Sequence, residues 1–226
     1  MTTASGAANP DVASLVIGVL GGTGDQGRGL ARRLSMAGHR VVIGSRKAER
    51  AAAAAAELGG DLLTGADNRD AAAAADVVIA AMPWEGHRDL LASLAEPLAG
   101  KVVIDCVNPM GFDSHGAYPL RVPEGSAAEQ AAAVLPGSTV VGAFHHVPAG
   151  MLLDPAAETV DMDVLVLGDN RAATDLVIAL VGEIPGMRGI FGGRLRNCGQ
   201  VEALTANLVS INRRYHAHAG VRVTGV

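Results

Sequence analysis

A glycine-rich turn near the N-terminus has the spacing that most clearly predicts chemistry. Gly22, Gly24 and Gly27 form a G-x-G-x-x-G pattern after a short apolar run, which is the dinucleotide-binding fingerprint. In that motif the first glycine permits a tight turn, the second lets the backbone approach a pyrophosphate, and the third allows close helix packing. The amide groups at the start of the following helix then bind phosphate. A plain glycine turn is the alternative, and a second predicted strand at residues 40–44 favours the nucleotide site.

The end of that second strand indicates which dinucleotide would bind. NAD sites usually carry an acidic residue about 20 residues after the glycines. This chain instead has Ser45, Arg46 and Lys47 there, with Arg50 one helical turn later. A hydroxyl and a planar guanidinium suit a ribose 2′-phosphate. We therefore expect NADP(H), and a solvated basic patch is the alternative interpretation.

Three further segments follow predicted strands and could reach the same crevice. Trp84 is the only tryptophan of the chain, and it is either a core aromatic or a platform for the cofactor. Asn108 precedes a proline and either forms a turn or contacts a bound ring. His145 and His146 are adjacent, and neighbouring residues of a strand point to opposite faces. We therefore expect one histidine to face the crevice, as a hydrogen-bond donor or general acid. No third ligand is spaced for zinc, so no metal site is expected.

The last predicted helix, residues 196–216, carries Arg213 and Arg214 near its end. These arginines either bind an anionic part of a ligand or face water, because cations are favoured at a helix C-terminus. The chain has no Ser-x-x-x-Lys or Tyr-x-x-x-Lys dyad. No lysine stands at the position expected of a hydroxyacid dehydrogenase base either.

Alternating strands and helices must position these side chains. The pattern predicts an α/β fold: a Rossmann-type, doubly wound parallel sheet with a small C-terminal α/β extension. Ligands of such sheets bind outside the carboxyl ends of the strands. The expected strands are residues 16–20, 40–44, 61–65, 76–81, 101–106, 139–144, 163–168 and 187–191. The expected helices are residues 30–37, 48–58, 68–75, 85–98, 126–135 (opened by a capping box), 170–181 and 196–216. Residues 110–125 are expected to form a long loop.

Three segments are expected along the chain. Residues 1–13 would be a flexible N-terminal tail, residues 14–150 an NADP-binding Rossmann domain and residues 151–226 a small C-terminal domain.

The composition narrows the class of partner. The 226 residues are 49% hydrophobic and carry a formal net charge of −5. Aromatic residues are only 3%, which disfavours base-stacking surfaces, and no apolar run reaches the ~18 residues of a membrane span. We expect small-molecule partners, no nucleic acid and no membrane. Cys106 and Cys198 do not form a disulfide framework, so a reduced, cytoplasmic protein is expected.

Four motifs occur together and resemble one known family. They are the glycine motif at residues 20–29, Gly-Ser-Arg at 44–46, Pro-Trp-Glu at 83–85 and His-x-x-Pro-Ala at 145–149. Their combination resembles the NADPH-dependent reductases of the 8-hydroxy-5-deazaflavin coenzyme F420, over residues 16–215. The resemblance implies a Rossmann domain, a small C-terminal domain that closes the deazaflavin pocket, and reversible hydride transfer between the two coenzymes. We also expect a homodimer.

The resemblance implies roles for individual residues. The pyrophosphate would be held by the turn, and the 2′-phosphate by the end of the second strand. Other matching positions would lie near the cofactor, and His145 or His146 would position a ring. The expected cofactor-binding residues are Gly22, Thr23, Gly24, Asp25, Gln26, Gly27, Ser45, Arg46, Arg50, Trp84, Asn108, Met110 and Ala149. The family often has lysine at the position of Arg50. Two alternatives are an NADP-dependent imine or carbonyl reductase, with a histidine as proton donor, and a non-enzymatic NADPH sensor.

Overall fold

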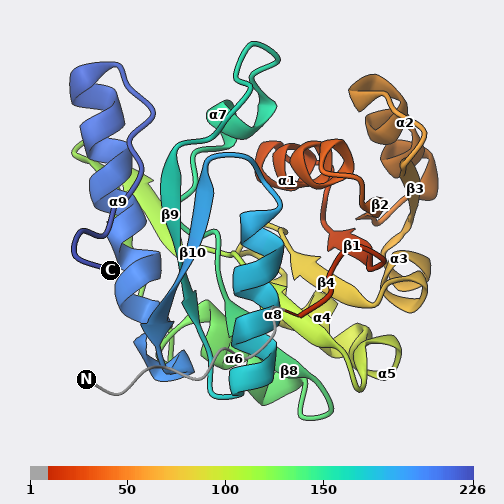
Figure 1. The fold of residues 1–226 in the computed structure, drawn as a ribbon. Coiled ribbons are helices and arrows are strands. Elements are labelled where there is room, and N and C mark those ends of the chain that lie inside the picture. Colours follow the sequence, from red (N-terminus) through yellow and green to blue (C-terminus); the bar gives the residue numbers. More distant parts are fainter. Residues whose placement is uncertain (1–9) are drawn as a thin grey trace, which may run out of the picture.

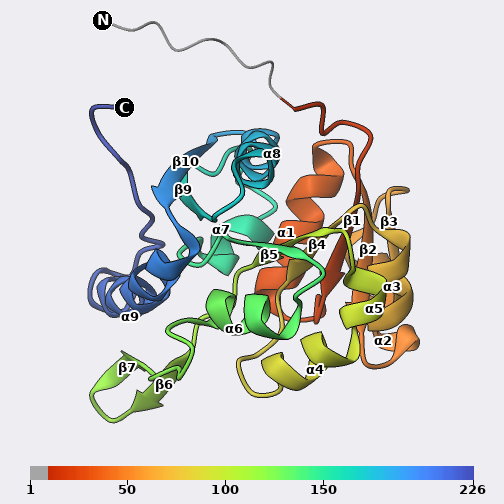
Figure 2. The ribbon, with the colours of Figure 1, turned by 90° about the horizontal axis from the view of Figure 1, so that it is seen from below.

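The computed structural model describes residues 10–226; most of the expected N-terminal tail, residues 1–9, lies outside the described part. Its centre is an eight-stranded sheet with helices on both faces (Figures 1 and 2). The strands are β1 (Val16–Leu20), β2 (Arg40–Ser45), β3 (Leu63–Asp67), β4 (Val77–Ala80), β5 (Val102–Asp105), β8 (Thr139–Gly142), β9 (Met162–Leu167) and β10 (Met187–Gly193).

The strand order is β10-β9-β8-β5-β4-β1-β2-β3. Every neighbouring pair is parallel except β8 and β9, which meet antiparallel at Gly142 and Leu167. The predicted doubly wound parallel sheet is therefore confirmed except at the junction of β8 and β9, which is antiparallel and which the alternation did not indicate. Strands β9 and β10 extend this sheet, and the division into domains at residue 150 stays a prediction.

Helices cover the sheet in two layers. One core lies beneath α1 (Asp25–Met36), α2 (Ala48–Leu58), α7 (Ala149–Leu153) and α8 (Arg171–Gly182). The other lies beneath α3 (Asn68–Ala74), α4 (His87–Ser93), α5 (Ala95–Leu98), α6 (Ala127–Val134) and α9 (Cys198–Tyr215), which a 3₁₀ turn at Leu195–Asn197 precedes. Because side chains alternate along a strand, Ile17 and Val19 of β1 enter the first core and Leu20 enters the second.

Several expected boundaries were wrong. Helix α1 begins directly after Gly24 rather than at Leu30. Gly27 and Gly29 are helical residues of its first turns and do not belong to the preceding turn. The strand expected at residues 61–65 is β3, two residues later. The helix expected at 85–98 is divided at Leu94 into α4 and α5; Pro97 lacks the amide proton that a continuous helix needs there. Helix α7 was not predicted.

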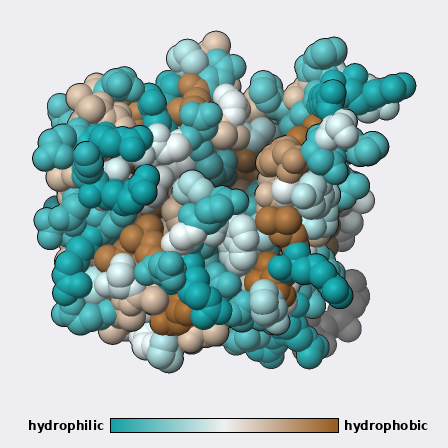
Figure 3. Space-filling view, turned by 180° about the vertical axis from the view of Figure 1, so that it is seen from behind, coloured by the Kyte–Doolittle hydropathy of each residue, from teal (hydrophilic) through white to brown (hydrophobic). Residues whose placement is uncertain are grey.

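The expected loop at residues 110–125 contains a β-hairpin. Strands β6 (Met110–Asp113) and β7 (Gly116–Pro119) pair antiparallel. The hairpin packs against α9 and projects from the body of the molecule (Figure 2). Polar residues cover much of the face shown in Figure 3, with scattered apolar patches between them. No helix in residues 10–226 is long and apolar enough to cross a membrane.

Candidate active site

The glycine turn is held by one hydrogen bond to the backbone of β2 and one to a side chain at the start of α3. The amide of Gly22 donates to the Gly44 carbonyl at 2.9 Å, and the amide of Gly21 donates to Asn68 Oδ1 at 3.1 Å. Gly21 has a φ of +65°, and an added Cβ would lie 2.7 Å from Met82 Cα, so a side chain is excluded there. These contacts fix the turn beside the end of β2. Asn68, which the sequence reading missed, supports the turn from the start of α3.

The start of α1 fits a diphosphate. The N-cap, Gly24, provides no side-chain hydrogen bond to the first turn, and an added Cβ on Gly24 would meet nothing within 4 Å. The space in front of these free amides is therefore open, as an approaching phosphate requires. At Gly27 an added Cβ would lie 2.6 Å from Gly22 Cα, so this glycine allows the helix to pack on its own turn. Thr23 and Asp25 flank the open position.

The residues expected to hold a 2′-phosphate lie at the end of β2, next to this turn. Ser45 is buried, at 5% exposure, whereas Arg46, Lys47 and Arg50 are exposed. They do not line the cavity at the carboxyl ends of β4, β5 and β8 that is described next. The end of β2 and the cavity are therefore two separate places, and a long dinucleotide has two ends, adenosine and nicotinamide, that lie far apart.

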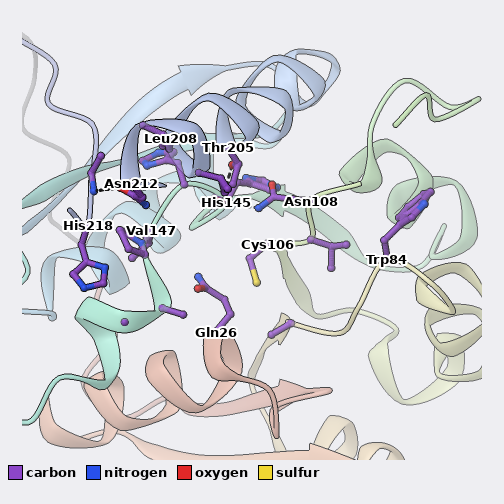
Figure 4. Close-up of a pocket in the computed structure, with 18 of the residues that line it drawn as sticks. Gln26, Trp84, Cys106, Asn108, His145, Val147, Thr205, Leu208, Asn212 and His218 are labelled. Carbon is purple, nitrogen blue, oxygen red and sulfur yellow. Dashed lines mark hydrogen bonds between the residues drawn. The ribbon is translucent and has the colours of Figure 1, made fainter. Parts of the chain in front are cut away.

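A cavity of about 420 Å³ opens at the carboxyl ends of β4, β5 and β8 (Figure 4). Gln26 reaches it from α1, Trp84 from the loop after β4, and Asn212 from α9 on another side. The cavity brings together the expected residues Gln26, Trp84, Asn108, His145, His146 and Ala149, and adds Thr205, Leu208, Asn212 and His218. Met110 begins the hairpin and is not among its lining residues.

The backbone carbonyl of His145 accepts hydrogen bonds from two other segments that line the cavity. Asn108 Nδ2 donates to the His145 carbonyl at 2.7 Å, and Thr205 Oγ1 donates to the same oxygen at 3.0 Å. The other amide atom, Asn108 Oδ1, is buried and has no hydrogen-bond partner within residues 10–226. A buried acceptor without a partner is costly, and a bound ring that donates a hydrogen bond would satisfy it.

Both histidines line the cavity, and both side chains are buried. The expectation of opposite faces does not apply, because β8 ends at Gly142 and Phe144 adopts a left-handed φ of 64°. His146 Nε2 accepts from the Leu165 amide at 3.2 Å. Neither ring nitrogen of His145 has a hydrogen-bond partner among the described residues.

Burial also fixes the protonation of these two rings. It lowers the pKa of His145 to about 4 and the pKa of His146 to about 4, so both imidazoles are neutral at pH 7. Neither is therefore suited to act as a general acid at that pH.

A row of buried, hydrogen-bonded polar side chains lies next to Trp84. His87 Nε2 lies 2.7 Å from Asp105 Oδ2, and His87 Nδ1 lies 3.0 Å from Gln130 Oε1. The Trp84 and His87 ring centroids are 5.6 Å apart, and Asp105 Oδ1 accepts from the Val107 amide at 3.0 Å. Burial opposes protonation of His87, but the hydrogen bond to Asp105 contributes to a raised pKa. The sequence reading missed this row of side chains; Asp105, an acidic residue ending an apolar run, was the available signal.

An arginine of α1 holds α7, whose first residue, Ala149, lines the cavity. The buried Arg33 guanidinium donates to the carbonyl groups of Met151, Leu152, Asp154 and Ala157 at 2.7–3.1 Å. Gly29 permits the close contact, because an added Cβ would lie 2.5 Å from Leu152 Cβ. This contact was not predicted from the sequence, because an arginine within a predicted helix is usually exposed to solvent.

The comparisons that cover most of both proteins identify one family. The family model described as NADP oxidoreductase, coenzyme F420-dependent, matches residues 16–109. The F420-dependent NADP reductase of Methanothermobacter thermautotrophicus is 41% identical, over 93% of this chain and 95% of that protein. The enzyme of the same name from Methanocaldococcus jannaschii is 38% identical, over 93% of this chain and 98% of that protein. A crystal structure from Arthrobacter sp. FB24, provisionally described as an F420-dependent NADP-reductase, has 28% identity and a TM-score of 0.77, covering 92% of this chain and 98% of that one.

Proposed function

This chain belongs to the family of F420-dependent NADP oxidoreductases, and we propose that its cavity holds the nicotinamide and deazaflavin rings in contact for direct hydride transfer. The family assignment makes the protein an oxidoreductase that uses NADP(H) and coenzyme F420. The proposal adds the direct route of the hydride, its reversibility and the residues involved.

The proposal depends most on one observation: the cavity lies between α1, which follows the glycine turn, and α9. Gln26 of α1, beside the glycine turn, lines one side, and Thr205, Leu208 and Asn212 of α9 line another (Figure 4). NADP(H) anchored at the turn would bring its nicotinamide ring in from the α1 side. The deazaflavin ring would then occupy the α9 side.

The nucleotide would be anchored at two places. Thr23, Gly24, Asp25 and Gln26 would hold the diphosphate at the free amides of α1, since Gly22 and Gly27 keep the turn tight. Ser45, Arg46 and Arg50 would hold the 2′-phosphate. The exposed positions of both arginines, next to the turn, support this role.

Within the cavity the chain would act by positioning. The two coenzymes supply the chemistry, because hydride passes from one ring carbon to the other when the rings are held at reacting distance. Trp84 would offer a flat platform supported by His87, and Ala149 leaves room for a ring. Asn108 would orient a ring through its free Oδ1. No metal and no covalent intermediate are needed, and His145 and His146 would shape the site through their buried rings.

We also propose a cytoplasmic homodimer. Cys106 and Cys198 are both buried free thiols, which suits a reducing compartment. Ile211 and Tyr215 are exposed one turn apart on α9, at 40% and 71%, and a second copy would cover them. Sedimentation should give twice the mass of one chain, and a single-chain mass would contradict the dimer.

A direct test mixes the protein with NADPH and oxidised deazaflavin coenzyme and follows the visible absorbance of the deazaflavin. We expect the absorbance to fall with stoichiometric oxidation of NADPH, and to return when NADP⁺ is added to the reduced coenzyme. A sensor would bind NADPH with no change in the deazaflavin. An imine or carbonyl reductase would oxidise NADPH only with such a substrate.

A further inference from the structure

The turn that carries Trp84 is closed by one backbone hydrogen bond. Trp84 lines the coenzyme cavity from the loop after β4 (Figure 4), and the His87 amide donates to the Trp84 carbonyl at 3.1 Å. Gly86 lies within the turn with a φ of +92°, which a residue with a side chain rarely adopts. The turn brings two aromatic side chains together, because the Trp84 and His87 ring centroids are 5.6 Å apart and their planes are inclined by 31°.

A set of neighbouring groups decides that Nδ1 of His87 carries a proton. Arg88 forms an ion pair with the carboxylate of Glu124, and a carboxylate accepts hydrogen bonds. Glu124 Oε2 lies 3.3 Å from Gln130 Nε2, which is the donating end of that amide. The carbonyl oxygen of Gln130 therefore faces His87, and His87 Nδ1 donates to it over 3.0 Å.

The other ring nitrogen of His87 faces a second carboxyl group. His87 Nε2 lies 2.7 Å from Asp105 Oδ2, and both side chains are fully buried. Asp105 Oδ1 accepts from the Val107 amide at 3.0 Å. Because imidazole is a stronger base than a carboxylate, the proton between the two groups resides on His87. Both ring nitrogens then donate, so the ring is an imidazolium, and Asp105 supplies the opposite charge that a buried cation requires.

The groups that face His87 from other elements support its charge. Burial lowers the pKa of His87, but the hydrogen bonds to Asp105 and Gln130 and the charges of Asp105 and Glu202 raise it above its ordinary value of 6.5. Glu202 belongs to α9 and itself titrates, because burial raises its pKa to about 7. Cys198 of the same helix remains a neutral thiol, because burial raises its pKa. His87 therefore loses its proton at a higher pH than a free histidine does.

We propose that His87 is a positioning residue of the coenzyme site. As a buried imidazolium held between Asp105 and Gln130, it fixes the indole ring of Trp84 through a cation–π contact, and this support is lost when alkaline solution removes the proton. The observed separation of the two rings is within the ~6 Å over which such a contact acts. The consequence for turnover rests on the proposed function, in which Trp84 is the platform for a coenzyme ring.

The fluorescence of Trp84 tests the contact in the protein alone, since Trp84 is the only tryptophan of the chain. An imidazolium beside an indole ring quenches its fluorescence more strongly than a neutral imidazole does. The emission should therefore rise in one transition with its midpoint above pH 6.5. His145 and His146 lose their protons near pH 4 and do not contribute to it. H87Q should abolish the transition, and D105N should move its midpoint to lower pH by about one unit or more.

Two control variants remove other titrating groups. H218Q removes the exposed histidine that lines the same cavity, and E202Q removes the carboxyl group on α9; each should keep the transition. Emission of the native protein that does not change above pH 6.5 would overturn the proposal, and this measurement needs no variant. A transition that persists in H87Q, or that D105N leaves at the same pH, would also overturn it.

Steady-state kinetics with NADPH and the deazaflavin coenzyme test the positioning role. Below the fluorescence transition, H87Q should lower kcat about 3- to 30-fold, the range that a cation–π contact can supply. It should change the KM for NADPH by less than about twofold, since the nucleotide anchors are untouched. The ratio of the native kcat to the H87Q kcat should fall towards one as the pH rises through the transition.

A kcat ratio that stays constant through the transition would overturn the positioning role of His87. Failure of the native protein to reduce the deazaflavin with NADPH at every pH would instead contradict the proposed function, and the fluorescence titration would still decide whether His87 is the cation beside Trp84.

Discussion

The side-chain amide of Asn108 donates a 2.7 Å hydrogen bond to the carbonyl oxygen of His145. This bond joins the segment after β5 to the segment after β8, 37 residues apart in the chain. It also fixes the amide so that Oδ1 remains buried and without a partner in the described structure. One side chain thus closes the cavity and leaves an acceptor for a ligand.

N108A should therefore affect both stability and binding. Losing the hydrogen bond should lower the free energy of unfolding by ~1 kcal/mol, and losing the acceptor should weaken one coenzyme about 5- to 20-fold. T205V is the control, since it removes the other hydrogen bond to the same carbonyl and spares the acceptor. Denaturant unfolding and coenzyme titration separate the effects. Equal loss of affinity in both variants would contradict a ligand contact for Oδ1.

R46A should lower the affinity for NADPH ~10- to 100-fold, because a charge-assisted hydrogen bond contributes roughly 1.5–3 kcal/mol. NADH lacks the 2′-phosphate, so its use should hardly change. R40A removes the same charge at the other end of β2, where Arg40 is exposed, and should change neither affinity. Titration with both nucleotides checks this. Equal losses for NADPH and NADH in R46A would exclude a 2′-phosphate contact.

G24V should abolish dinucleotide binding and leave the protein folded. The added side chain enters open space, since no atom lies within 4 Å of the Cβ position, and it would occupy the place of the diphosphate. G27V is the contrasting variant, because its Cβ would lie 2.6 Å from Gly22 Cα. This clash should lower the unfolding temperature of the protein. Normal NADPH binding by folded G24V would mean that the nucleotide binds elsewhere.

Stability should depend on pH through Glu202. This buried carboxyl accepts from the Ala127 and Ala128 amides at 2.9 and 3.2 Å, yet burial raises its pKa from 4.5 to about 7. The folded state thus favours the protonated form, and that stabilisation is fully present below pH 4.5 and lost as the pH rises to 7.

E202Q removes this titration, so its free energy of unfolding should rise relative to that of the native protein between pH 4.5 and 7, by about 1–3 kcal/mol. E183Q, at an exposed position, should show no such trend. Denaturant unfolding at several pH values measures both. A difference between E202Q and the native protein that stays constant, or falls, would contradict the raised pKa.

The parts of the fold governed by local patterns were predictable. Helix α2 was predicted with its observed bounds, since an alanine-rich segment favours a helix, and β1 was predicted likewise, since a buried parallel strand reads as an apolar run. The antiparallel placement of β9 was not predictable, because strand direction depends on how the chain returns to the sheet. The β6–β7 hairpin was missed for a related reason, since its Ser114–His115 turn lacks the usual Asn-Gly or Asp-Gly signal.

The candidate site divides in the same way. The glycine turn and the end of β2 form a contiguous local motif, and their chemistry follows from residue type. Thr205 and His218 reach the cavity only because α9 and the C-terminal segment fold over the strand ends, which no local spacing encodes. The roles of His145 and His146 could not be predicted either. The left-handed backbone of Phe144 changes the direction in which the chain continues after β8, and burial lowers the pKa of both rings.

The central claim is direct hydride transfer between NADPH and the deazaflavin, and isotopic labelling tests it most directly. The protein is supplied with NADPH carrying deuterium on one face of the nicotinamide ring, then on the other, and the reduced deazaflavin is analysed by mass spectrometry and NMR. Direct transfer should place deuterium on the reacting ring carbon of the deazaflavin from one of the two labelled forms, and none from the other. Deuterium found only in the solvent would contradict it.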